Sequence, residues 1–175
     1  MELRACDNEA YFITLTVIDW IDVFTRREYM DFIVENLNYC RTEKGLEIYA
    51  FVIMSNHIHL IVRSKIEPLG NILRDFKTYT SKELFKMIDK NTRESRRDWM
   101  INAFKNAAFN NPLNKFHQFW QNDNQPILIN NHETFLTKQN YIHQNPVRAG
   151  LVVNDFEYVY SSASENCPLT IDPFS

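Results

Sequence analysis

The sequence of 175 residues predicts an α+β fold in which helices pack on one face of an antiparallel, ferredoxin-like sheet. Two observations indicate this class. The hydrophobic patterns follow the order strand, helix, strand, strand, helix over the first half of the chain. A short Ser-Asn turn at positions 55 and 56 joins two of these strands directly, as in a hairpin. We expect helical and hairpin additions after this unit, and a single domain over residues 1–175.

The first two elements are a strand and a helix. Residues 11–17 alternate and are rich in β-branched side chains, which is typical of a strand. Residues 26–42 carry apolar side chains at helical spacing. Gly45 predicts the end of this helix, because glycine is common just past a helix C-terminus.

The next three elements are strands over residues 46–54 and 57–63 and a helix over residues 68–89, with proline in its first turn. Side chains of a strand alternate between the two faces of a sheet, so His57 and His59 point the same way. Two imidazoles on one face, separated by one residue, can reach a single metal ion.

The C-terminal part predicts a helix over residues 99–109 and a second one over 133–144, which stops before an Asn-Pro pair. Between them, residues 116–120 and 127–129 resemble strands and supply either the last strand or a small hairpin. We expect the tail after residue 153 to be an extended arm that closes over the core, with loose last residues.

The composition predicts a globular cytoplasmic protein. Hydrophobic residues make up 45% of the chain, yet no apolar run approaches the ~20 residues that a membrane span needs. The N-terminal residues have no apolar core of the signal-peptide kind. The formal charge is −3, but residues 63–105 hold eleven Lys or Arg against six Asp or Glu. Such a basic band on an acidic body is compatible with nucleic-acid binding and does not require it.

Two blocks of the sequence resemble one family of enzymes. The His-Ile-His strand, preceded by Met-Ser-Asn and followed by a helix with Lys-Thr-Tyr-Thr around Tyr79, resembles the HUH-type single-tyrosine transposases. A second block, Tyr-Ile-His-Gln-Asn-Pro-Val from residue 141, is followed by Tyr-Ser-Ser at residues 160–162. It narrows the resemblance to the branch of the REP-associated tyrosine transposases. Together the matches span residues 11–163, nearly the whole chain.

The resemblance implies a metal-dependent transposase or endonuclease that acts on single-stranded DNA with hairpin-forming ends and associates with the nucleoid. In this reading Tyr79 attacks a phosphodiester and forms a 5′-phosphotyrosine. The metal, Mg²⁺ or Mn²⁺, is held by His57, His59 and a residue one helical turn past the tyrosine. Glu83 has that position here, where the family often has Gln.

Further residues are candidates for DNA contacts. Cationic side chains can bind phosphates, and those nearest to Tyr79 can also favour its phenolate. An indole can stack on unpaired bases. The candidates are Arg63, Lys65, Arg74, Lys77, Lys82, Trp120 and Arg148. We expect His143, in the second block, to be a structural residue near a helix end.

Other functions stay open from the sequence. The negative net charge and the Glu at the third ligand position also fit a non-catalytic nucleic-acid-binding module, such as a domesticated transposase. A small metal enzyme with other substrates is a further alternative, although a simple hydrolase needs no nucleophilic tyrosine. A homodimer is possible, and the sequence does not decide whether the tyrosine serves its own chain or a partner.

Overall fold

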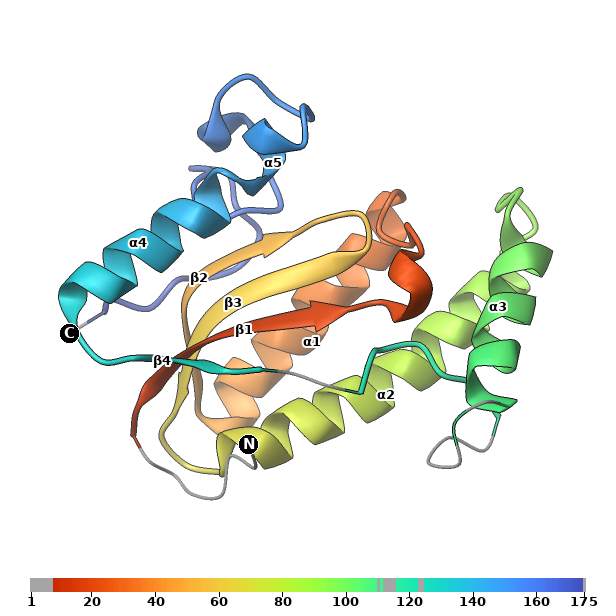
Figure 1. Ribbon diagram of the computed structural model, residues 1–175, viewed down its shortest axis with the longest axis horizontal. Helices are drawn as coiled ribbons and strands as arrows, with labels where there is room; N and C mark the ends of the chain where they lie inside the picture. The colour runs from red at the N-terminus through yellow and green to blue at the C-terminus, as the bar shows by residue number, and fades with distance from the viewer. Residues whose placement is uncertain (1–7, 110, 112–115, 123–124, 175) are drawn as a thin grey trace.

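The computed structural model describes residues 8–109, 111, 116–122 and 125–174. Its centre is an antiparallel sheet with the strand order β2-β3-β1-β4, as Figure 1 shows. The strands are β1 (Ala10–Thr16), β2 (Leu46–Ile53), β3 (His57–Ser64) and β4 (Ile127–Ile129). This is the order of a ferredoxin-like sheet, so the predicted α+β fold is confirmed, and the strand with the two histidines is an interior strand.

Helices α1 (Arg27–Lys44) and α2 (Leu69–Lys90) cover one face of the sheet. Alternate residues of the strands, such as Leu15 and Leu60, point to this face and pack against apolar residues of both helices. Gly45 adopts a φ of 72° and ends α1, as predicted. Helix α3 (Arg97–Phe109) packs beside α2 and extends beyond the sheet (Figure 1).

The other face of the sheet is covered by α4 (His132–His143), which continues after Gln144 into the short helix α5 (Asn145–Arg148). Phe135 and Ile142 of α4 are buried with Phe12 and Val52 of the strands in a second core. Both faces of the sheet therefore carry helices, whereas the sequence predicted helices on one face. The C-terminal helix was expected as an addition and is in fact the second layer.

The tail lies along the edge strand β2, as the prediction of an extended arm requires. The backbone N–H of Ile53 donates to Tyr160 O over 2.9 Å, and that of Ser162 donates to Phe51 O over 2.9 Å. The prediction of loose last residues is wrong for Phe174, while Ser175 lies outside the described residues. The ring of Phe174 stacks on that of Phe135 with 4.0 Å between their centroids, beside the start of α4 (Figure 1).

The remaining predicted runs have different outcomes. Residues 127–129 form the last strand, paired with β1, while Trp120 forms an isolated bridge with Val17.

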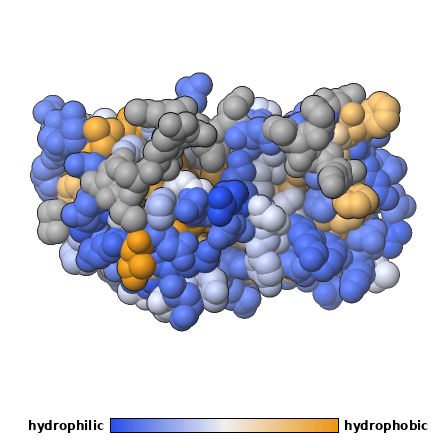
Figure 2. Space-filling view, turned by 90° about the horizontal axis from the view of Figure 1, so that it is seen from below, coloured by the Kyte–Doolittle hydropathy of each residue, from blue (hydrophilic) through white to orange (hydrophobic). Residues whose placement is uncertain are grey.

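The surface seen in Figure 2 is mainly hydrophilic, with its hydrophobic residues in small separate groups. Within the described residues, every helix is too short or too polar to cross a bilayer.

The carboxylate of Asp172 fixes the end of the tail to the body of the protein. It accepts hydrogen bonds from Arg41 Nη2 and Nε over 2.9 and 3.1 Å, and from the backbone N–H of Ile48 over 2.9 Å. Burial alone would raise the pKa of Asp172, but the Arg41 guanidinium and the Ile48 N–H lower it below its usual value. This contribution to stability is therefore present above the pKa of the unfolded aspartate and is lost as the pH falls through the folded pKa.

We expect Asp172→Ala to lower the free energy of unfolding by about 1.5–3 kcal/mol at pH 7, because hydrogen bonds to a charged group are lost. The measurement is urea unfolding at pH 7 and in a series of acidic buffers, where the difference from the wild type should shrink. Glu165→Ala is the matched control, since Glu165 is exposed on the same tail. Equal effects of the two substitutions would show that Asp172 does not fix the tail.

Candidate active site

The imidazoles of His57 and His59 lie side by side on the face of β3 that α4 covers. Their ring centroids are 4.6 Å apart. His59 is 5% exposed, and its ring stacks on Phe12, a member of the second core, over 5.3 Å. His57, at the first position of the strand, is half-buried. The predicted alternation of the strand thus brings the two histidines together.

Hydrogen bonds fix the orientation of both rings. His57 Nδ1 lies 2.7 Å from Asn56 Oδ1, and His59 Nδ1 lies 2.8 Å from Thr14 Oγ1. Asn56 Nδ2 donates to Asp22 Oδ1 over 3.0 Å, so its oxygen must be the atom that faces His57. His57 Nδ1 therefore carries the proton, and its Nε2 keeps a free lone pair.

Burial keeps both histidines neutral. Burial, followed by the charges of His57, Arg148 and Lys138 acting in the same direction, lowers the pKa of His59 to about 3. Burial also lowers the pKa of His57, and the nearby side chain of Asn145 opposes this shift only in part. A neutral imidazole is the form that ligates a metal ion.

Two polar residues at the end of α4 and the start of α5 complete the site. The ring of Tyr141 lies 5.3 Å from that of His59, centroid to centroid, and the residue is 39% exposed. Asn145, one helical turn later, lies near His57, and its side chain raises the pKa of that imidazole. Its Nδ2 donates to the backbone oxygen of Tyr141 over 2.8 Å, which leaves Oδ1 as the atom directed to the histidines.

Two cations flank the tyrosine. The guanidinium carbon of Arg148 lies 4.5 Å from the centroid of the Tyr141 ring, and Arg148 Nη2 donates to the Tyr141 backbone oxygen over 2.8 Å. Lys138 Nζ lies 6.0 Å from the same centroid. Arg148 was among the predicted DNA contacts, whereas sequence reasoning missed Lys138. The site therefore combines two neutral imidazoles, a phenol, an amide and two positive charges.

A second set of contacts holds α4 in place behind the site. His143 Nε2 lies 2.9 Å from Ser162 Oγ, which also accepts a hydrogen bond from the backbone N–H of Phe51 over 3.0 Å. His143 is thus in a structural position, as expected. The block that begins at residue 141 and the Tyr-Ser-Ser segment at residues 160–162 therefore contact each other here, although 19 positions separate His143 from Ser162.

The structure does not bring Tyr79 or Glu83 to the histidine pair. Both residues lie on α2, which packs on the opposite face of the sheet. The Tyr79 ring is 54% exposed and stacks on Phe32 over 6.2 Å, and Glu83 pairs with Lys86 over 2.8 Å. The expectation that these two residues face the histidines is therefore wrong within one chain. The local sequence does not encode which face of the sheet a helix covers.

Most cations of the basic band that were predicted to contact DNA bind other groups of the protein instead. Arg63 and Lys65 both pair with Glu47. Arg74 pairs with Asp75 over 3.0 Å, Lys77 Nζ donates to Gln121 O over 2.6 Å, and Lys82 is exposed on α2.

The prediction that Trp120 stacks on unpaired bases is also wrong. Its side chain is 4% exposed, and its Nε1 donates to Thr80 Oγ1 over 3.0 Å. A buried indole with a satisfied N–H is a core residue and cannot stack on a base.

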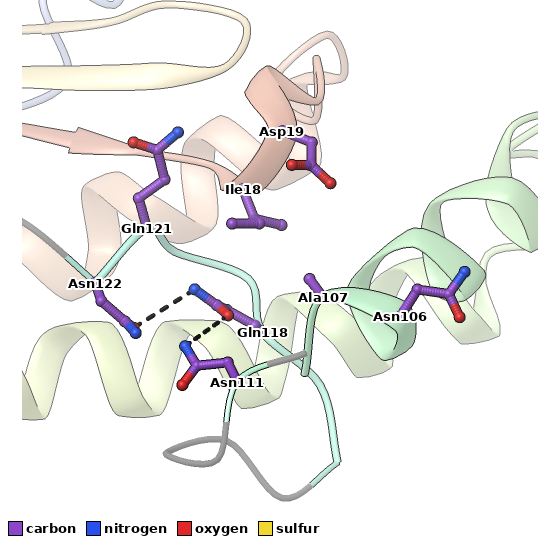
Figure 3. Close-up of a pocket in the computed structure, with 8 residues that line it drawn as sticks. All are labelled: Ile18, Asp19, Asn106, Ala107, Asn111, Gln118, Gln121 and Asn122. Carbon is purple, nitrogen blue, oxygen red and sulfur yellow. Dashed lines mark hydrogen bonds between the residues drawn. The ribbon is translucent and has the colours of Figure 1, made fainter. Parts of the chain in front are cut away.

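A separate pocket of about 500 Å³ lies between the turn after β1 and helix α3 (Figure 3). Most of its side chains are amides. Gln118 is buried and its Nε2 donates to Trp120 O and Asn122 Oδ1, while its Oε1 accepts from Asn111 Nδ2. Among the described residues, its lining contains no cation and no member of the histidine site. It is lined by Ile18, Asp19, Asn106, Ala107, Asn111, Gln118, Gln121 and Asn122.

Comparisons with known proteins identify a family and a similar fold. Residues 8–101 match the family model described as "Transposase IS200 like". The fold is similar to the solved structure of a REP-associated tyrosine transposase bound to a REP hairpin, with a TM-score of 0.61 and 16% identity over 89% of this chain and 76% of that chain. A candidate transposase from Deinococcus radiodurans R1 has a TM-score of 0.46 and 16% identity, over 77% of this chain and 88% of that one. No curated protein matches the chain by sequence.

We expect Asn56→Ala to weaken Mn²⁺ binding by about 10–100-fold, because the amide that fixes the proton and orientation of His57 is lost. Isothermal titration of the purified protein with Mn²⁺ measures this. Asn102→Ala, at an exposed position of α3, is the control and should bind Mn²⁺ like the wild type. Equal affinities of the two variants would exclude the orienting role of Asn56.

Proposed function

The chain belongs to the IS200-like transposase family, and from this premise we propose that it is a metal-dependent transposase or endonuclease for single-stranded DNA, with Tyr141 as its nucleophile. One observation carries the proposal. Tyr141 is the tyrosine that lies beside the histidine pair, 5.3 Å from His59 between ring centroids, within a single chain. This arrangement supports a site built from one chain, with or without a homodimer around it.

The donor atoms of the site fit a divalent cation. His57 and His59 would hold it through Nε2, and Asn145 through Oδ1. Among the described residues no third His, Cys, Asp or Glu joins the pair, and the Asn145 amide would be the third donor. Two imidazole nitrogens with one amide oxygen suit Mn²⁺ better than Mg²⁺, which prefers oxygen ligands. When bound, such a cation would polarise the scissile phosphate and offset the charge that develops on it.

In the proposed reaction the phenol oxygen of Tyr141 attacks the phosphorus of a phosphodiester. The new bond joins Tyr141 Oη to phosphorus, and the bond from phosphorus to the 3′ oxygen breaks. The phenol loses its proton to solvent and the 3′ oxygen takes one up, which leaves a 5′-phosphotyrosine and a free 3′ hydroxyl. Because a phosphodiester is conserved in the adduct, the strand can be rejoined without ATP.

The cations beside the tyrosine support a phosphate at this place. Arg148 is held by the Tyr141 backbone oxygen and by the face of its ring, so its position is fixed before a strand binds. Lys138 adds a second charge from one turn earlier on α4. Hairpin-forming DNA is the proposed substrate, since the REP-associated transposase with the similar fold was solved with a REP hairpin.

We expect Tyr141→Phe to abolish the covalent adduct, by a factor of about 10³ or more, because the attacking oxygen is removed. Binding of the strand should stay within a few-fold. The measurement is a denaturing gel after incubation with Mn²⁺ and a panel of labelled single-stranded hairpins. Tyr79→Phe is the matched control, being a second exposed tyrosine, and should form the adduct at the wild-type rate.

The outcomes of this assay separate the readings of the protein. Adducts that survive in Tyr141→Phe and disappear in Tyr79→Phe would return the nucleophile to Tyr79, acting on the site of a second copy. Adducts that disappear in His57→Ala would support the metal site. Binding of hairpins without any adduct would favour a non-catalytic nucleic-acid-binding module.

We expect Arg148→Gln to weaken the binding of single-stranded DNA and to reduce the slope of log affinity against log salt by about 0.7, because one phosphate contact is lost. Fluorescence anisotropy with a labelled strand, at several salt concentrations, measures both quantities. Arg74→Gln is the control, since Arg74 is exposed on α2 at the other face of the sheet. An unchanged slope in Arg148→Gln would show that this guanidinium does not contact a phosphate.

A further inference from the structure

An exposed indole stands beside the histidine pair and has no part in the reaction described above. Trp20 belongs to the short 3-10 turn η1 (Ile18–Trp20) that follows β1. Its side chain is 59% exposed, and its ring contacts that of His57 edge to face, with 6.0 Å between the centroids. More than half of this indole is therefore open to a ligand that enters the site.

The backbone that presents this indole is strained. Asp19 has a φ of 52° and Trp20 a φ of 55°, in the left-handed region that bulky residues rarely adopt. This conformation is unfavourable for a side chain as bulky as that of Trp20, and it persists only where the surroundings determine it. Strain of this kind concentrates at binding and active sites.

Hydrogen bonds hold the strained turn from both sides. Ile18 N donates to Phe119 O over 2.8 Å, and Ile21 N donates to Ile18 O over 3.2 Å. The carbonyl of Trp20 accepts from Asn56 Nδ2 over 3.3 Å. Asn56 is also the residue that orients His57, so one amide positions the indole and the imidazole together.

Acidic neighbours limit what this indole can bind. Asp19 and Asp22 are both exposed on either side of Trp20, whereas the cations of the site, Arg148 and Lys138, lie by Tyr141. A phosphate backbone would be repelled from the turn and attracted to the tyrosine side. A strand with a phosphate at the site would therefore turn the flat, uncharged part of a nucleotide toward the indole. That part is the base.

We propose that Trp20 is a stacking platform for the unpaired base adjacent to the phosphate held at the histidine site. The proposal rests on the proposed function, since it needs a single strand in this site. It makes Trp20 a positioning residue, which sets the place of the strand relative to Tyr141 without touching the reacting atoms. Stacking is tolerant of sequence, because every base has a π-face.

Tryptophan fluorescence tests the contact directly. Hairpins with single-stranded tails are titrated into the Tyr141→Phe protein, which binds the strand without cleaving it. Stacking on Trp20 should quench the tryptophan emission. The quenching should disappear when the Tyr141→Phe protein also carries Trp20→Phe, and it should persist when the protein carries Trp99→Phe instead. Trp99 is the matched control because it is 58% exposed, on α3. In the same background Trp20→Ala should weaken binding by roughly 5- to 150-fold.

An abasic scan separates stacking from a merely structural role. Removing the base next to the scissile phosphate should weaken binding to the protein with Trp20 by the same factor as Trp20→Ala does. Removing it should have no further effect on the Trp20→Ala protein. The proposal would be overturned if removal of the base and Trp20→Ala weakened binding independently, so that their factors multiply. It would also be overturned if the Trp20→Ala protein bound as tightly as Trp99→Ala.

The two proposals fail in different ways. Adduct formation by the wild type, together with unchanged affinity in Trp20→Ala, would leave the proposed function standing and remove the role of Trp20. Absence of any binding to single strands would overturn both. Mn²⁺ titration of Trp20→Phe checks that the histidine site is intact in the variant, and it should match the wild type.

Discussion

The packing of α4 across the second face of the sheet is the interaction on which the candidate site depends. Phe135 and Ile142 anchor this helix against Phe12 and Val52, and burying each such side chain contributes about 1.5–3 kcal/mol. The same packing places Tyr141, which precedes Ile142 in the chain, above His59. The apolar face of the helix thus determines where its polar residues lie. Without this layer the histidines would lie on an open sheet.

Most elements of the fold could be predicted because their signals are local. Strand alternation, helical spacing and Gly45 are each read within a few residues, and they also predict that His57 and His59 share a face. The layer that a helix joins is not local. Tyr79 with Glu83 and Tyr141 with Asn145 have the same spacing of one helical turn, so the sequence alone could not choose between them. Long-range contacts such as that of His143 with Ser162 determine which helix faces the histidines.

Trp20 and Trp120 show the same limit at the level of single residues. The sequence assigned Trp120 to base stacking, yet its N–H is satisfied by Thr80 inside the core. It assigned no role to Trp20, because the left-handed turn there lacks the glycine or asparagine that usually signals a positive φ. The turn is instead imposed by distant partners, Asn56 and the backbone of Phe119.

The electrostatics of the site fit the proposed binding of DNA, although the chain has a net charge of −3. Cations of the predicted basic band are partly neutralised by Glu47, Asp75 and Glu94. Positive charge instead concentrates beside Tyr141, on residues that lie outside that band.

The histidines and these cations favour ligands of opposite charge. The charges of Arg148 and Lys138 contribute to the low pKa of His59, so they favour an anion there and disfavour a proton on the ring. The Nε2 lone pair of His57, directed away from the bond that holds its Nδ1, can bind a cation. A divalent metal at the histidines together with a phosphodiester at the cations would match both preferences at once, whereas either ligand alone would match only one of them.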